Sequence, residues 1–147
     1  MTPTLILIHS LLRWAVILVM VSVTAAMAFR YVKAAVWTAS DRRSALLFTI
    51  VLDTQFLVGL VVYGVSPITR GAMKDMATAM HEPSVRYFVA EHPTMMLLSV
   101  LLAHAGSVFA KKALTDRAKF GRATAFFAAS TALMLWGIPW FRLMAAH

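Results

Sequence analysis

The sequence has no cysteine among its 147 residues and few acidic side chains, six Asp and Glu against fourteen Lys and Arg. The absence of cysteine excludes disulfides, thiolate metal sites, iron–sulfur clusters and covalent c-type haem attachment. Only 14% of the residues are charged, whereas charged residues make up about a quarter of a soluble domain. The chain also lacks a P-loop, an HExxH pair, a Ser/His/Asp set and a nucleotide-binding glycine pattern, which excludes the enzyme classes that depend on them.

Long apolar runs dominate what is present. Hydrophobic residues make up 61% of the chain, and the mean hydropathy is +0.76. Four stretches are each about as long as the ~20 helical residues that cross a bilayer; they cover residues 4–29, 45–65, 94–110 and 123–141. The sequence therefore predicts an all-α fold, an integral membrane bundle of four transmembrane helices that forms one domain over residues 1–147. The predicted helices cover residues 4–33, 43–65, 84–112 and 118–143.

The net charge of +8 is concentrated in two short connections between the apolar stretches. Their basic residues are Arg30, Lys33, Arg42 and Arg43 in the first connection, and Lys111, Lys112, Arg117, Lys119 and Arg122 in the last. The positive-inside rule places both connections in the cytoplasm, so both termini and the middle loop are predicted to be extracytoplasmic. Because no nucleic-acid recognition module is present, the predicted partner of this charge is the anionic bilayer surface and not nucleic acid.

The middle loop contains three methionines at helical spacing, Met73, Met76 and Met80. Residues at this spacing lie on one helical face, which predicts a short amphipathic helix at the membrane interface. Thioethers are also soft ligands for Cu(I) and can bind haem iron. Met76 and Met80 with His81 are therefore a second candidate metal site, and an ordinary apolar face is the alternative.

Two histidines stand near the outer ends of the first and third predicted helices, His9 and His92. Both helices run inward from the same side, so the two imidazoles reach a similar depth. Facing histidines on different helices suit the axial ligation of haem b, whereas zinc or copper would need further ligands. The alternative is that His9 is only an interfacial polar residue and His92 only a helix-terminal one.

Arg13 lies one helical turn below His9 on the same face. An arginine costs about 2.5–3.5 kcal/mol at the centre of a membrane helix, so a partner is expected. The candidates are Glu91, which precedes His92, and a haem propionate. Snorkelling of the arginine to the headgroups is the alternative.

Asp53 and His104 lie deeper in the second and third apolar stretches. Ionisable residues inside a membrane are functional candidates, and a partner should accompany them. We expect these two to pair. A proton path, a contact with quinone and a purely structural interhelical hydrogen bond all remain open.

Eight segments together resemble a family of small bacterial four-helix inner-membrane proteins that is loosely described as cytochrome b-like. They are His9–Trp14, Gln55–Tyr63, Ser66–Pro67, Asp75–Met76, Ala79–Met80, Arg86–Phe88, Glu91–His92 and Ile138–Trp140. The resemblance implies a bacterial inner membrane and haem b on His9 and His92. Asp53 departs from the pattern where relatives carry another polar residue or histidine, and His104 is not part of it.

The leading interpretation is a cytochrome b-like membrane protein that holds one haem b near the extracytoplasmic face. It would transfer electrons, with quinone or within a larger redox complex or homo-oligomer, as a component and not as a stand-alone enzyme. The alternatives are a non-catalytic accessory subunit and a copper-handling membrane protein.

Overall fold

The structure, a computed structural model, describes residues 2–140, and this range contains helices and no strand. The elements are α1 (Thr2–Val32), α2 (Ala39–Val65), α3 (Pro67–Ala72), α4 (Met76–His81), α5 (Pro83–Arg86), the π-helix η1 (Tyr87–Glu91), α6 (His92–Lys111) and α7 (Asp116–Trp136). The all-helical prediction is confirmed for the described residues.

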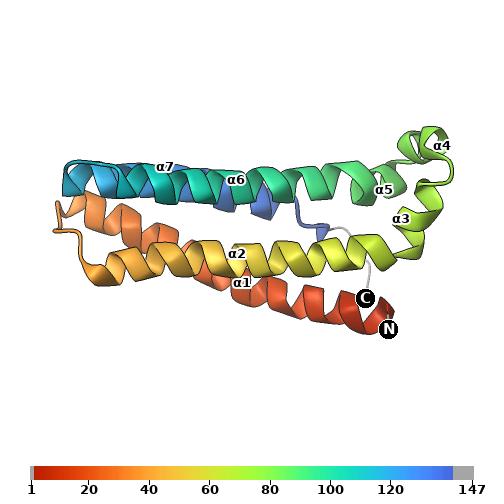
Figure 1. Cartoon of the computed structure of the whole chain (residues 1–147), viewed down its shortest axis with the longest axis horizontal. Helices are drawn as coiled ribbons and strands as arrows, with labels where there is room; N and C mark the ends of the chain where they lie inside the picture. The colour runs from red at the N-terminus through yellow and green to blue at the C-terminus, as the bar shows by residue number, and fades with distance from the viewer. Residues whose placement is uncertain (1, 141–147) are drawn as a thin grey trace.

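The four long helices form one elongated bundle (Figure 1). Helix α2 packs on α1 and α6, and α7 packs on the same two helices from the other side. Helices α1 and α6 are therefore diagonal to each other. The start of α1 lies at the same end of the bundle as α3, α4 and α5, and the connections 33–38 and 112–115 lie at the opposite end.

Within the described range, three helical segments are long and apolar enough to cross a membrane: Pro3–Val32, Ala39–Val65 and Pro83–Lys111. Helix α7 does not meet the same measure, because its first two turns carry Asp116, Arg117, Lys119 and Arg122. It also ends at Trp136, short of residue 143, since Gly137 caps it and Pro139 cannot continue a helix. The last predicted helical residues, 141–143, lie outside the described residues.

Helix α2 begins four residues earlier than predicted because Thr38 caps it. The Thr38 side chain accepts the backbone N–H of Asp41, and the Asp41 carboxylate accepts the backbone N–H of Thr38 at 2.8 Å. This reciprocal pair is a capping box. Asp41 also makes an ion pair with Arg30 at 2.8 Å, which connects the end of α1 to the start of α2.

The segment between α2 and α6 contains short helices in place of one amphipathic helix. Met73 lies in the turn between α3 and α4, so the three methionines do not share one helical face. Asp75 explains the interruption, because its side chain accepts the backbone N–H of Thr78 and starts α4 as a new helix.

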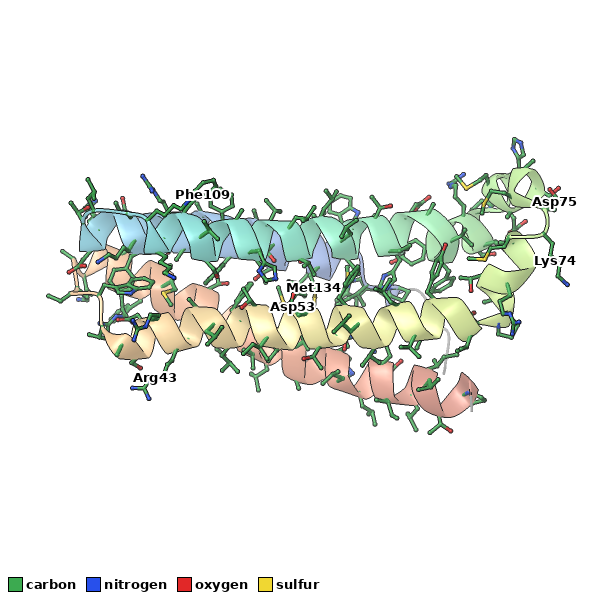
Figure 2. The ribbon with its side chains drawn as sticks, viewed as in Figure 1. Arg43, Asp53, Lys74, Asp75, Phe109 and Met134 are labelled. Carbon is green, nitrogen blue, oxygen red and sulfur yellow. The ribbon has the colours of Figure 1, made fainter. Side chains whose placement is uncertain are left out.

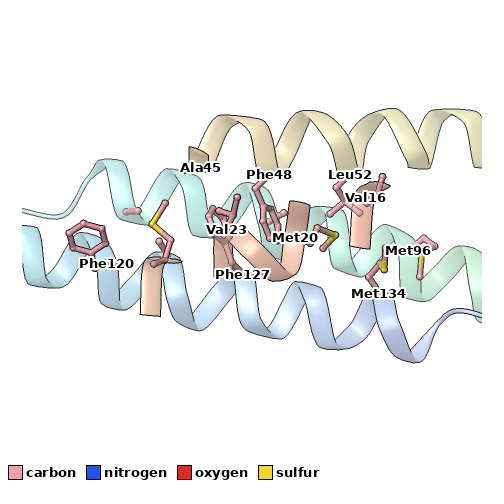
Figure 3. Packing of buried hydrophobic residues seen from close by; sticks show 14 of the residues in the cluster. Val16, Met20, Val23, Ala45, Phe48, Leu52, Met96, Phe120, Phe127 and Met134 are labelled. Carbon is pink, nitrogen blue, oxygen red and sulfur yellow. The ribbon is translucent and has the colours of Figure 1, made fainter. Parts of the chain in front are cut away.

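Large apolar side chains fill the middle of the bundle, and Figure 3 shows Phe48 and Phe127 at its centre. Their rings stack with centroids 4.1 Å apart and planes 8° from parallel. Nearby, the buried Ser99 and Ser130 join α6 to α7, since each hydroxyl donates to the other residue's carbonyl at 2.9 and 2.8 Å. Such polar contacts between helices are typical of membrane bundles.

Candidate functional site

The two histidines near the α3–α5 end approach each other across the bundle. His9 comes from α1 and His92 is the first residue of α6, and their ring centroids are 6.4 Å apart with planes 89° from parallel. Diagonal helices carry the two residues, so both imidazoles point toward the bundle axis. The structure thus places His9 and His92 side by side, while their predicted role as ligands stays a prediction.

A cavity of about 560 Å³ contains both imidazoles. Its walls are mainly apolar side chains from all four long helices, including Leu52, Phe56, Leu60, Met96, Met134 and Ile138. Figure 3 shows three of these, Leu52, Met96 and Met134, at one end of the hydrophobic core. The volume lies within the range of about 300–1,000 Å³ that is usual for small-molecule sites, and a few polar groups in an apolar wall are typical of such sites.

The carbonyl of Gly137 fixes the orientation of His92. His92 Nδ1 lies 2.5 Å from this oxygen, and the Tyr87 hydroxyl donates to the same oxygen at 2.8 Å. A carbonyl can only accept, so Nδ1 carries the proton and Nε2 keeps its lone pair. Metal-binding histidines usually have this arrangement, with one nitrogen tied to a backbone carbonyl and the other available to the metal.

A π-helix brings His92 to this position. Tyr87–Glu91 forms η1, and the His92 N–H bonds to the Tyr87 carbonyl five residues earlier. The next residue is Pro93, which cannot supply the N–H that a regular helix would direct at the Val89 carbonyl. The Tyr63 hydroxyl of α2 donates to that carbonyl at 3.1 Å instead. Single π turns often occur at functional sites.

Residues of α2 position the other histidine, His9 of α1. Gln55 donates from Nε2 to the backbone carbonyl of His9 at 3.1 Å. A Cβ built on Gly59 would lie 3.1 Å from the imidazole carbon Cε1 of His9. Gly59 thus makes room for the ring, and His9 Nδ1 is buried without a hydrogen-bond partner among residues 2–140.

Arg13 lines the same cavity and is only 8% exposed. Its guanidinium lies 5.3 Å from the centroid of the Trp14 ring, and its Nε is buried with no hydrogen-bond partner in the described part of the chain. The predicted partner Glu91 is not used, because that carboxylate pairs with Arg86 at 2.7 Å. Arg86 is well placed for this ion pair because it lies five residues before Glu91, on the same π-helical turn. A snorkelling arginine would extend its guanidinium to the headgroups. Arg13 is instead buried in the bundle, so the structure differs from that alternative.

Three polar atoms that are buried without a hydrogen-bond partner among residues 2–140 therefore belong to residues of one cavity: His9 Nδ1, Arg13 Nε and the Gln55 side-chain oxygen Oε1. Buried polar groups in proteins are nearly always satisfied by the protein, by water or by a ligand. The cavity is consequently suited to a molecule that is mostly apolar and carries a few polar groups.

The second candidate site is much more open. Met76 and Met80 of α4 are 43% and 39% exposed, and His81 at the end of α4 is also exposed. Within residues 2–140, no group of three or more His, Asp or Glu side chains is placed to hold a metal ion. Met76, Met80 and His81 are not among the residues that line the cavity with His9 and His92.

Asp53 and His104 do pair, as predicted. His104 Nε2 lies 3.0 and 3.1 Å from the two carboxylate oxygens of Asp53. The two side chains are 37% and 52% exposed, respectively, so the pair lies on the outside of the bundle. Figure 2 shows Asp53 between the ribbons of α2 and α6. The pair is therefore separate from the cavity.

Sequence spacing does not assign Gln55, Gly59, Tyr63 or Tyr87 to the cavity, although each positions a histidine or its helix. A sequence signal does exist for three of them. Gln55, Gly59 and Tyr63 are four residues apart, and residues at this spacing lie on one face of a helix. Comparisons of this chain with described protein families, with curated proteins and with solved structures find no match.

Proposed function

We propose that the cavity holds one haem b with His9 and His92 as axial ligands, and that the protein is an electron-transfer component of a membrane. The observation that carries the proposal is the pair of imidazoles 6.4 Å apart inside an apolar cavity, with His92 Nε2 available to a ligand. Haem b supplies reversible one-electron transfer when it is bound.

The donor set suits haem better than a bare metal ion. One or two protein ligands would be enough to hold a haem iron, whereas zinc sites use at least three. Metal-bound imidazole nitrogens lie about 2 Å from the metal, so two imidazoles that share one iron have their nitrogens about 4 Å apart. Ring centroids 6.4 Å apart are compatible with this spacing.

The other residues of the cavity would orient the cofactor and exclude water. Arg13 places a positive charge beside His9 and lacks a carboxylate partner in the described chain, so it can pair with a propionate. The Gly137 carbonyl keeps the proton on His92 Nδ1, which increases the basicity of the nitrogen facing the cavity. The apolar walls keep the site dry.

The membrane setting that we propose follows the charge pattern. The connections 33–38 and 112–115 face the cytoplasm, α7 is the fourth span, and both termini and the exposed methionines of α4 face the other side. The haem would then lie near the extracytoplasmic face of a bacterial inner membrane. Its electron partner would be a lipid-soluble carrier or another subunit of a redox complex.

Absorbance spectra of the purified protein, oxidised and dithionite-reduced, test the haem proposal. We expect a low-spin b-type spectrum that His9→Ala and His92→Ala each abolish. His81→Ala, which removes an exposed histidine, is the matched control and should leave the spectrum unchanged. If both cavity variants keep the low-spin spectrum, the ligand assignment is wrong.

A redox titration tests the role of Arg13 in the same preparation. Arg13→Leu should lower the midpoint potential or weaken haem retention, because a nearby positive charge favours the reduced state. Arg13→Lys should keep part of the effect, since it retains the charge without the planar guanidinium. Full occupancy and an unchanged midpoint in Arg13→Leu would remove the arginine from the site.

A further inference from the structure

The Asp53–His104 pair lies where a polar group is least expected. Asp53 is near the middle of α2, with about 20 Å of helix on either side. His104 reaches it from α6, and the two side chains are 52% and 37% exposed for His104 and Asp53. Ionisable residues at such depth almost always face a bundle interior or a water-filled cavity. In a membrane-embedded bundle this pair would face lipid.

The pairing leaves one nitrogen of the imidazole unused. The His104 Nε2–H donates to both carboxylate oxygens of Asp53, at 3.0 and 3.1 Å. A hydrogen bond from one ring nitrogen fixes the tautomer, so Nδ1 is left with a lone pair. Within residues 2–140 no hydrogen bond to His104 Nδ1 is seen. A hydrogen-bond acceptor without a donor is unfavourable in hydrocarbon, where water cannot satisfy it.

The surroundings of the pair resemble a lipid-facing surface and not a helix-docking surface. The neighbouring outward side chains are large and aliphatic: Ile50 and Leu57 on α2, and Leu101 and Val108 on α6, are 46–61% exposed. Helix–helix contacts in membranes instead use small residues that let two backbones approach closely. A molecule dissolved in the lipid can reach the pair without displacing a packed helix.

We infer that the Asp53–His104 pair is a binding site for the ring hydroxyl of a lipid-soluble hydroquinone, which donates a hydrogen bond to His104 Nδ1. The Asp53 carboxylate accepts from His104 Nε2–H and so orients the imidazole. The site lies about 18 Å along α6 from His92, so it is distinct from the haem cavity. It requires the membrane setting but does not require that haem be bound.

The test measures saturable binding of a decyl-substituted benzohydroquinone to the full chain in phospholipid nanodiscs under anaerobic conditions, after subtraction of partition into empty discs. The dimethyl ether of the same compound has the ring and the chain but no hydroxyl donor. We expect saturable binding of the hydroquinone only. His104→Phe should weaken it about tenfold or more, as the loss of one hydrogen bond to a polarised acceptor predicts.

Thr54→Val is the matched control, because Thr54 is exposed at the same depth and donates only to its own helix, at Ile50. It should bind the hydroquinone as the unchanged protein does. Equal binding by His104→Phe, or equal binding of the dimethyl ether, would overturn the inference.

A second result would also overturn it. If the protein forms a dimer in large nanodiscs and His104→Phe dissociates that dimer, a second copy of the chain covers the pair. The haem spectrum of His104→Phe should be normal, so loss of hydroquinone binding and loss of haem can be told apart. A circular dichroism spectrum equal to that of the unchanged protein shows that the variant is folded, whether or not haem is bound.

Discussion

The hydroxyl of Tyr63 takes the place of a backbone N–H donor that Pro93 cannot provide. The contribution of this hydroxyl to the free energy of unfolding can be measured. The Tyr63 hydroxyl donates to the Val89 carbonyl at 3.1 Å, and Val89 is buried. In Tyr63→Phe this carbonyl loses that donor. An unsatisfied buried polar group costs about 1–3 kcal/mol, whereas side-chain hydrogen bonds between membrane helices average about 0.6 and reach about 1.7 kcal/mol. We expect a loss of about 1–2 kcal/mol of unfolding free energy.

Pro93→Ala supplies the test of the mechanism. Alanine restores a backbone N–H at position 93, which can bond to the Val89 carbonyl as in a regular helix. Tyr63→Phe should then cost little when it is made in the Pro93→Ala background. The double-mutant cycle should give a coupling free energy of about 1 kcal/mol between the two positions.

Reversible unfolding in mixed detergent micelles, followed by circular dichroism on protein without added haem, measures all four variants. An equal cost of Tyr63→Phe with proline or alanine at position 93 would refute the reasoning, because the tyrosine would then not be compensating for the proline. The result also concerns the candidate site. Pro93 directly follows the π-helix and His92, and the π-helix places His92 in the cavity.

Two further predictions concern packing and topology. Gly106→Ala should destabilise the bundle by about 1–3 kcal/mol in the same assay, because the new Cβ would lie 2.6 Å from the Cβ of Phe126; Gly64→Ala, which meets nothing within 4 Å, should not. The chain has no cysteine, so single cysteines report topology cleanly. Leu114→Cys, at a position 99% exposed, should resist an impermeant thiol reagent in intact cells, whereas Met73→Cys, at a position 57% exposed, should react. The reverse pattern would invert the proposed orientation.

Much of the architecture follows from composition and local pattern. Apolar runs of about 20 residues predict membrane-length helices, because the bilayer fixes the length that must be covered. The starts and ends of helices follow local capping rules. Where the predicted helix bounds differ from the structure, the cause is also a local cap. Thr38 caps α2 before the predicted start, and Asp75 interrupts the predicted amphipathic helix by starting α4. Such segments contain several residues that could serve as an N-cap, and the local sequence does not decide which of them starts the helix.

The residue types of the candidate site and their approximate positions along the helices were predictable from the sequence. His9 and His92 fall at similar depth because their helices run in the same direction, and Asp53 and His104 were expected to pair. Glu91, one of the two candidate partners of Arg13, instead pairs with Arg86, which the π-helical turn brings close to that carboxylate. Spacing rules assume a regular helix, and η1 shifts every residue before it around the helix axis.

The sequence by itself determined that this chain is helical and apolar, and at which positions along its apolar helices the histidines and charged residues lie. These properties depend on residues near one another in the chain and on the thickness of a bilayer. Only the tertiary structure decided that α1 and α6 are diagonal, that Gln55 and Gly59 position His9, and that the Asp53–His104 pair faces outward. The rotation of each helix about its axis is set by long-range packing, and that rotation decides whether a polar side chain enters the cavity or lies on the outside of the bundle.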